Sequence, residues 1–174
     1  TFGYVTHDQT AAMTMGDRIV VRKDGILQQN DAPQVLYDTP CNLFVAGFIG
    51  SPQMNFLDAV IAEKDGGYIA KLAGGEEVVL PARMNKELLG SYTGKTVDLF
   101  IRPEDVEAVS ASEPHNLEAR IEIAELMGAE INLHVDYKNV RIVARTGSAF
   151  PGREGDMAAL RFKQDKLHLF EKET

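Results

Sequence analysis

The strongest constraint on the fold is a series of short apolar segments that fills the chain after residue 52. Apolar and polar residues alternate along them, and Gly, Pro, Asn, Asp and Lys turns separate them at the spacing typical of a sandwich or small barrel. We therefore predict a mainly β domain at 52–174, a five-stranded antiparallel barrel of the oligonucleotide/oligosaccharide-binding (OB) type with extra strands. Helix is expected only near 82–89 and in connections. The predicted strands are 55–62, 68–72, 77–80, 96–102, 117–126, 130–137, 140–145, 157–162 and 167–170.

Residues 1–51 have a different pattern, in which strands and short helices alternate. Segment 3–6 has the composition of a strand end, and segment 8–15 has the Ala and Met content of a short helix with an acid in its first turn. His7 is therefore predicted to lie at a strand-to-helix corner. A histidine at such a corner is placed as in a catalytic or binding site, although only six residues precede it in this sequence.

A hairpin and two more helices are predicted before the domain boundary. Asp24-Gly25 separates two strand-like segments, and glycine tolerates the positive φ of a tight hairpin turn. One short helix is expected to begin at Pro33 and a second to cover 42–49. Gly50-Ser51-Pro52 then interrupts the chain, so we predict a short α/β segment over 1–51 and the β domain over 52–174.

Composition excludes some classes of function. The 174 residues carry a formal net charge of −8, so the chain lacks the basic surface that a nucleic-acid backbone or an anionic membrane requires. No apolar run is long enough to span a bilayer. The single cysteine, Cys41, cannot form an intrachain disulfide, and we expect it to pack as a small apolar side chain.

Several distinctive stretches occur along the chain. They are YVTHDQ (4–9), DRIVV (17–21), LYDTP (36–40), NLFVAGFIGSP (42–52) and MNFL (54–57), followed by IRPE (101–104), ELMGAE (125–130) and LHLF (167–170). Together they resemble the last part of the ATP-binding subunit of carbohydrate-importing ABC transporters of the maltose, multiple-sugar and glycerol-3-phosphate type. The resemblance spans essentially the whole chain, and its motifs are densest before residue 57.

The resemblance implies a role for His7 that the residue pattern alone does not give. His7 matches the family's switch histidine, which contacts the γ-phosphate of ATP and helps to hold the attacking water. An imidazole at such a corner can donate to a phosphate oxygen as charge develops there. Without the surrounding motif, a lone histidine after a strand is more often structural.

The resemblance also implies that the chain is a fragment. It contains no G-x-x-x-x-G-K-[ST] loop, no strand ending in paired acids and no signature serine-glycine-glycine segment, all of which phosphoryl transfer in this family uses. The parent would be an ATPase that uses ATP and Mg²⁺, and residues 1–51 would be the end of its nucleotide-binding domain. The β domain would be a regulatory OB-like domain of the TOBE type. The fragment itself is expected to bind no cofactor or metal and not to hydrolyse ATP.

Two further features have competing interpretations. Arg102 and Glu104 match the family and are candidates for a regulatory or interface role, although a strand end stopped by Pro103 with two solvated charges explains them as well. Glu130, Asn132, His134 and Asp136 share one face of a predicted strand, as ligands of a metal would. We interpret that row as the solvated face of a half-buried strand. His115 and His168 have no partner at ligand spacing and receive no role.

Two functional hypotheses follow. In the first, the parent hydrolyses ATP to import a sugar or sugar-phosphate, working on the inner face of the membrane with permease subunits and a second copy of itself. The β domain then regulates this motor. In the second, the β domain is a barrel that binds a small ligand or a regulatory protein and so modulates the transporter. The sequence identifies neither the solute nor the regulator.

Overall fold

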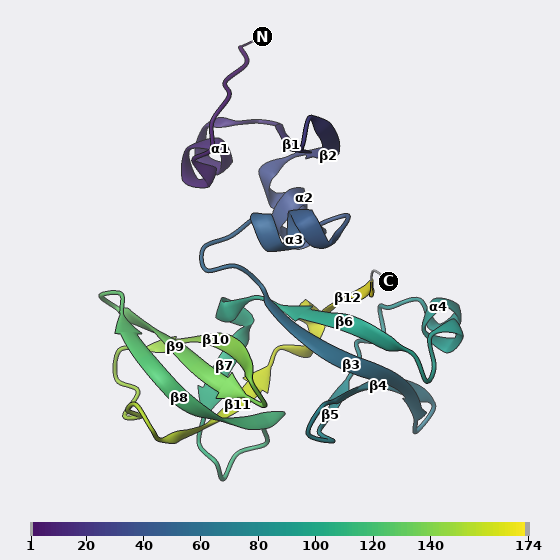
Figure 1. Ribbon diagram of the computed structural model, residues 1–174, viewed down its shortest axis with the longest axis vertical. Helices are drawn as coiled ribbons and strands as arrows, with labels where there is room; N and C mark the ends of the chain where they lie inside the picture. Colours follow the sequence, from purple (N-terminus) through teal and green to yellow (C-terminus); the bar gives the residue numbers. More distant parts are fainter. Residues whose placement is uncertain (1, 173–174) are drawn as a thin grey trace. The chain divides into compact units, whose positions relative to one another are not determined.

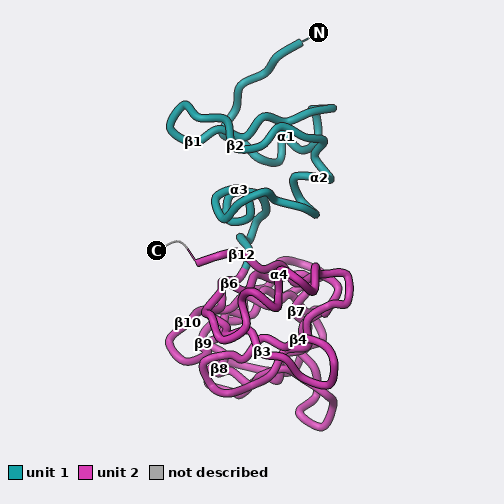
Figure 2. The backbone as a smooth tube through the Cα atoms, turned by 90° about the vertical axis from the view of Figure 1, so that its right-hand side faces the viewer, with its two compact units in different colours: residues 1–54 teal, residues 55–174 magenta. Residues whose placement is uncertain are grey.

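The computed structural model describes residues 2–172, which form two compact units. Unit 1 comprises residues 1–54 and unit 2 residues 55–174 (Figure 2). Each unit has its own hydrophobic cluster. The division falls three residues after the boundary that the sequence predicts, because Met54 is still counted with the helices that precede it.

Unit 1 is a β-hairpin surrounded by three short helices. Strands β1 and β2 pair in antiparallel fashion, and the turn between them places Asp24 at φ +51° and Gly25 at φ +81°. These two positive φ values are those of a hairpin turn that asparagine, aspartate and glycine accept. The small core consists of Val21, Leu36, Val45 and Ile49. The elements are α1 (Gln9–Met15), β1 (Ile19–Lys23), β2 (Ile26–Asp31), α2 (Pro33–Asp38) and α3 (Leu43–Phe48).

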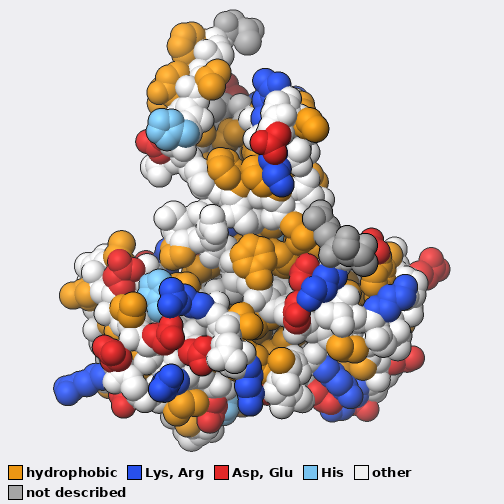
Figure 3. All heavy atoms as spheres, in the orientation of Figure 1, with side chains coloured by type: hydrophobic (Ala, Val, Ile, Leu, Met, Phe, Trp, Pro, Cys, Tyr) orange, Lys and Arg blue, Asp and Glu red, His pale blue; other side chains and the backbone are white. Residues whose placement is uncertain are grey.

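The strand predicted for residues 3–6 is wrong, since the structure has irregular chain there. A strand needs a neighbour to accept its backbone hydrogen bonds, and β1 and β2 pair only with each other among the described residues. The side chain of Val5 is 98% exposed as a result. Other large apolar side chains of unit 1, such as Phe2 and Ile26, are exposed too, and Figure 3 shows apolar groups on the surface of this unit.

Unit 2 is mainly β and contains two five-stranded antiparallel sheets (Figure 1). In the first sheet the strand order is β12-β6-β3-β4-β5, and in the second it is β10-β9-β8-β11-β7. The bounds in the first sheet are β3 (Asn55–Lys64), β4 (Gly67–Leu72), β5 (Glu77–Val79), β6 (Thr96–Ile101) and β12 (His168–Glu171); those in the second are β7 (Val106–Val109), β8 (Leu117–Leu126), β9 (Glu130–Tyr137), β10 (Val140–Gly147) and β11 (Met157–Phe162).

The two sheets share one core. Alternate residues of the long strands, such as Leu57, Ala59 and Ile61 on β3, are buried, and they belong to the same cluster as Leu133 and Val135 on β9. The arrangement is a nearly closed antiparallel barrel. The two edges of the second sheet, β7 and β10, are neighbours in space but are not joined by the strand pairings of the described residues, so this sheet curves almost into a closed ring.

Helix is limited to connections, as the sequence predicts. Helix α4 (Lys86–Ser91) begins four residues later than expected, because the Asn85 side chain accepts hydrogen bonds from the backbone N–H groups of Glu87 and Leu88 and so caps the helix at that point. Two 3₁₀ turns, η1 (Pro103–Asp105) and η2 (Gln164–Lys166), precede β7 and β12. Strand β7 itself is absent from the predicted strands.

One side chain joins the two sheets. The carboxamide of Asn55, the first residue of β3, donates to the carbonyl of Val143 at 2.8 Å and accepts from its N–H at 2.7 Å. Asn55 is only 4% exposed. Its side chain thus takes the place of a neighbouring strand along part of the outer edge of β10.

Replacing Asn55 by leucine is therefore expected to lower the free energy of unfolding by about 2–4 kcal/mol, since both backbone groups of Val143 lose their partner away from water. Urea unfolding of the chain measures this effect. Asn30→Leu, at an exposed position of unit 1, is the control and should change stability by less than about 0.5 kcal/mol. Equal midpoints for the two variants would contradict the prediction.

Candidate functional site

His7 lies at the start of helix α1, as predicted, and its side chain is exposed. The next residue, Asp8, caps the helix: its side chain accepts from the N–H of Ala11 at 3.1 Å, and its own N–H donates to the hydroxyl of Thr6 at 2.9 Å. These two bonds fix the backbone on both sides of the histidine. The backbone on both sides of His7 is therefore ordered by these bonds, and the exposed imidazole is accessible to a ligand that approaches unit 1.

Arg102 is the N-cap residue of the 3₁₀ turn η1, which connects β6 to β7, and Glu104 is the middle residue of that turn. Arg102 is only 3% exposed, so the interpretation of two solvated charges is wrong for this residue. A buried guanidinium requires partners, and Arg102 does take part in interactions. Arg102 directly follows β6, which has a neighbouring strand on both sides in its sheet.

Glu104 is half-buried, and the loss of solvent raises the pKa of its carboxyl group, an effect that the nearby positive charges of Arg145 and Lys163 reduce. Lys163 lies beside the same turn and donates to the backbone carbonyl of Glu104 at 3.1 Å. Glu104 therefore belongs to a charged group that joins the η1 turn to β10 and to the end of β11. The structure brings Arg102 and Glu104 to this turn and leaves His7 in the other unit.

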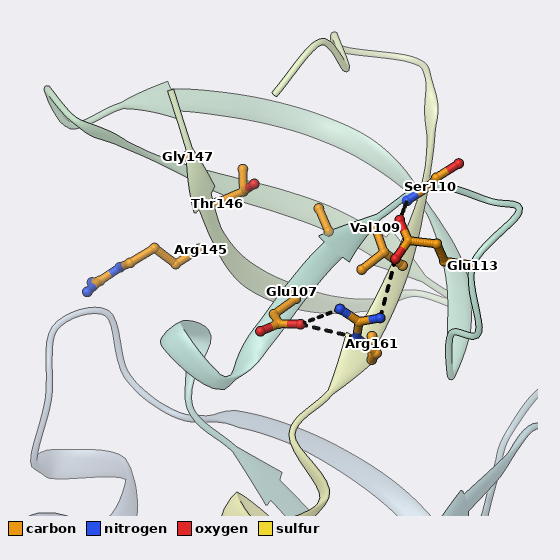
Figure 4. A pocket seen from close by; sticks show the side chains of 9 residues that line it. Glu107, Val109, Ser110, Glu113, Arg145, Thr146, Gly147 and Arg161 are labelled. Carbon is orange, nitrogen blue, oxygen red and sulfur yellow. Dashed lines mark hydrogen bonds and ion pairs between the residues drawn. The ribbon is translucent and has the colours of Figure 1, made fainter. Parts of the chain in front are cut away.

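An open pocket of about 440 Å³ lies at the gap between β7 and β10 (Figure 4). One wall carries Glu107 and Glu113, which both bind the guanidinium of Arg161, at 2.8 and 3.5 Å. The other wall is the end of β10, with Arg145 and Thr146. The lining is polar and contains equal numbers of acidic and basic side chains. The sequence gives no sign of this pocket, because its walls come from strands that meet only in the folded barrel.

The polar row on β9 is divided among separate contacts. His134 Nε2 lies 3.5 Å from a carboxylate oxygen of Glu125 on β8, and Glu130 lies 3.6 Å from the guanidinium of Arg145 on β10. Asn132 is only 5% exposed. The expectation that the whole row is solvated is therefore wrong for this residue. Among the described residues, no three His, Cys, Asp or Glu side chains are grouped so as to hold a metal ion.

We expect His168 on β12 to make the stability of the barrel depend on pH. Burial lowers the pKa of its imidazole, and the positive charges of Arg83 and Arg102 lower it further. The folded chain thus favours the neutral ring, so its contribution to stability is present above the unfolded pKa of about 6.5 and is lost as the pH falls through the folded value.

The urea midpoint of the chain is accordingly expected to fall between pH 7.5 and pH 5, and to fall less in His168→Gln. The variant isolates this group from Glu104, whose raised pKa acts in the opposite direction on acidification. An identical pH dependence in the chain and in the variant would rule out His168 as the cause.

Two domain families match the chain. Residues 50–106 match the family described as the MalK OB fold domain, and residues 99–170 match the TOBE domain. None of the described helices is long and apolar enough to cross a membrane.

Relatives match over the whole length of the chain. The chain is 42% identical over 175 residues to an uncharacterized ABC transporter ATP-binding protein, YcjV, of Escherichia coli O6:K15:H31, covering 100% of this chain and 47% of that protein. It is 39% identical to the oligosaccharides import ATP-binding protein MsmX of Bacillus subtilis, covering 98% and 47%. It is 42% identical to the trehalose/maltose import ATP-binding protein MalK of Thermococcus litoralis, covering 98% and 46%. The chain thus spans about half the length of these relatives.

A solved structure shares the fold. The cytoplasmic molybdate-binding protein ModG, in a form with molybdate bound, superposes with a TM-score of 0.56 at 15% identity, covering 68% of this chain and 96% of that one. Such a likeness concerns the arrangement of strands alone.

Proposed function

We propose that this chain, whose residues 50–170 belong to the MalK OB fold and TOBE domain families, is the C-terminal regulatory part of the ATP-hydrolysing subunit of a carbohydrate importer. The whole chain is related to ATP-binding proteins of sugar importers. The single observation that carries this proposal is the end-to-end match to those proteins at about 40% identity. The solute is proposed to be a sugar or sugar-phosphate.

Within this proposal, His7 is the one residue of the chain that acts in hydrolysis. Its exposed imidazole at a capped helix start is suited to donating a hydrogen bond to a phosphate oxygen of ATP. ATP also needs a cradle for the triphosphate and ligands for Mg²⁺, and the described residues provide neither a metal-binding group of three side chains nor a glycine-rich loop with its lysine. We therefore assign no step of hydrolysis to this chain alone.

The exposed apolar side chains of unit 1 support the same proposal. Val5, Ile26 and Leu27 are each more than half exposed in a small unit with few buried residues, and such a surface favours further protein contact. In a protein of the length of the relatives, we propose that the preceding nucleotide-binding segment covers it. The proposed partners are membrane-spanning permease subunits and a second copy of the subunit, at the cytoplasmic face of the membrane.

The test is ATP hydrolysis by the full-length subunit assembled with its permease subunits in proteoliposomes. We expect hydrolysis that a transported carbohydrate stimulates, and no hydrolysis by residues 1–174 alone. A full-length assembly that binds no ATP, or that responds to no carbohydrate, would overturn the proposal. Uptake of labelled sugars and sugar-phosphates by the same vesicles identifies the solute class.

A second candidate function, the binding of a small ligand or regulatory protein by the barrel, is favoured by the pocket between β7 and β10. Ligand binding to the folded state raises the melting temperature, by an amount that grows with the logarithm of ligand concentration over Kd. A thermal shift with sugars, sugar-phosphates or inorganic phosphate that is lost in Thr146→Val would support it. No shift at millimolar concentrations would exclude these small ligands.

A further inference from the structure

A long-range hydrogen bond ties the histidine corner to the start of the OB segment. The side-chain oxygen Oε1 of Gln9 accepts from the backbone N–H of Gly50 at 3.0 Å, across 41 residues of sequence, and the bond is partly buried. Both residues lie in unit 1. The bond is independent of the hairpin and of the pocket in the barrel.

Gln9 occupies a position from which it can fix His7. It is the first residue of α1 and lies two residues after the histidine. The helix has one apolar anchor, Met13, which packs against the small core of unit 1. In addition to this contact, a directional hydrogen bond at the first residue of the helix restricts where the corner lies.

Gly50 is the point where the chain leaves helix α3. The N–H of Ile49, the C-cap of that helix, still donates to the carbonyl of Val45, while the next amide along, that of Gly50, donates to Gln9 instead. Gly50 has φ +118°, a backbone conformation that only glycine adopts readily. Residues 51–54 then lead directly into β3, which begins at Asn55.

We propose that Gln9 is a positioning residue that couples the path of the chain into the barrel to the placement of His7. The proposal rests on the function proposed above for His7. A change in the course of residues 50–54 moves the Gly50 amide, and the Gln9 carboxamide carries that movement to the first turn of α1. A regulatory event that alters the path of the chain into the barrel can thereby change the position of the His7 side chain through the hydrogen bond between Gly50 and Gln9.

The bond itself is tested in the present chain by amide hydrogen exchange. Gln9→Leu removes the acceptor, and we expect Gly50 to exchange about fivefold to tenfold faster, the size of one ordinary hydrogen bond. Gln9→Glu keeps an oxygen acceptor and should retain the protection. The matched control is Gln34→Leu, which removes an exposed glutamine bonded only to Asp38 on its own helix. Unchanged exchange at Gly50 in Gln9→Leu would overturn the proposal.

The coupling is tested in the full-length subunit assembled with its permease subunits. Gln9→Leu should lower kcat for ATP hydrolysis about tenfold to a hundredfold with KM nearly unchanged, because the reacting geometry is disturbed and ATP binding is not. Gln9→Glu should restore most of kcat. A normal kcat in Gln9→Leu would overturn the proposal, and so would a Gln9→Glu variant as slow as Gln9→Leu.

A His7→Ala variant distinguishes a failure of the function proposed for His7 from a failure of the positioning role proposed for Gln9. If His7→Ala hydrolyses ATP at the normal rate, the proposed function of His7 fails and the coupling has no target. If His7→Ala is inactive while Gln9→Leu is normal in both exchange and kcat, only the positioning role of Gln9 is refuted.

Discussion

Replacing His7 by alanine in the full-length subunit is expected to lower ATP hydrolysis by about 10²- to 10⁴-fold, the usual contribution of a positioned proton-transfer or charge-stabilising group. Nucleotide affinity should stay nearly intact, because the imidazole acts on the charge that develops in the transition state and little on the bound ground state. Single-turnover hydrolysis and equilibrium binding of a nucleotide analogue, measured in the assembled transporter, separate these two effects.

His115→Ala serves as the control for that experiment, since His115 lies in the barrel beside Glu118 and has no proposed role. It should hydrolyse ATP at the normal rate. Normal turnover in His7→Ala would show that His7 is only a structural residue at the start of α1. Repurified residues 1–174 should show no turnover, and activity that survives repurification would contradict the assignment of the missing parts of the site to the rest of the subunit.

The second large effect concerns the core that the two sheets of unit 2 share. Leu133 on β9 is fully buried, and Leu133→Ala is expected to lower the free energy of unfolding by about 3–5 kcal/mol through lost burial and the cavity that remains. Because one core serves both sheets, both should lose protection together. Urea unfolding followed by amide exchange in β4 and in β9 measures this.

The same hairpin provides a matched control. Leu126, the last residue of β8, is 67% exposed, so Leu126→Ala should change stability by less than about 0.5 kcal/mol. Separate transitions for β4 and β9 in the Leu133 variant would mean that the sheets unfold independently and that the shared core does not couple them.

Much of the fold could be predicted because local pattern and tertiary packing agree in the barrel. On β3, buried and exposed residues alternate from Asn55 to Ala59, and this period of two specifies a strand with one buried face. The predicted bounds of 117–126, 130–137 and 157–162 coincide with those of β8, β9 and β11. Strand β7 was not predicted, because its four residues follow a proline-containing turn and are only partly buried beyond Val106.

Less of the candidate sites could be predicted, because they depend on contacts between distant segments. The start of helix α1 next to His7 could be predicted because the capping residue, Asp8, is local in sequence. The strand expected at 3–6 requires a pairing partner, and none of the described strands pairs with it. The burial of Arg102, the pocket beside β7 and the bond from Gln9 to Gly50 depend on how strands and loops meet. Cys41 is exposed and not packed as expected, since its thiol points to the carbonyl of Gln28 at 3.3 Å on the hairpin surface.

The pairing of β12 with β6 sets a condition on how the chain folds as it is synthesised. Strand β12 (His168–Glu171) forms one edge of the sheet that begins with β3, and its residues pair with Val97–Phe100. During translation the N-terminal strands of that sheet emerge about a hundred residues earlier, with the side of β6 that β12 will occupy still uncovered. The barrel therefore reaches its final strand order only after residues 168–171 have left the ribosome, and a chain whose synthesis stalls before residue 168 has an open sheet edge available to chaperones.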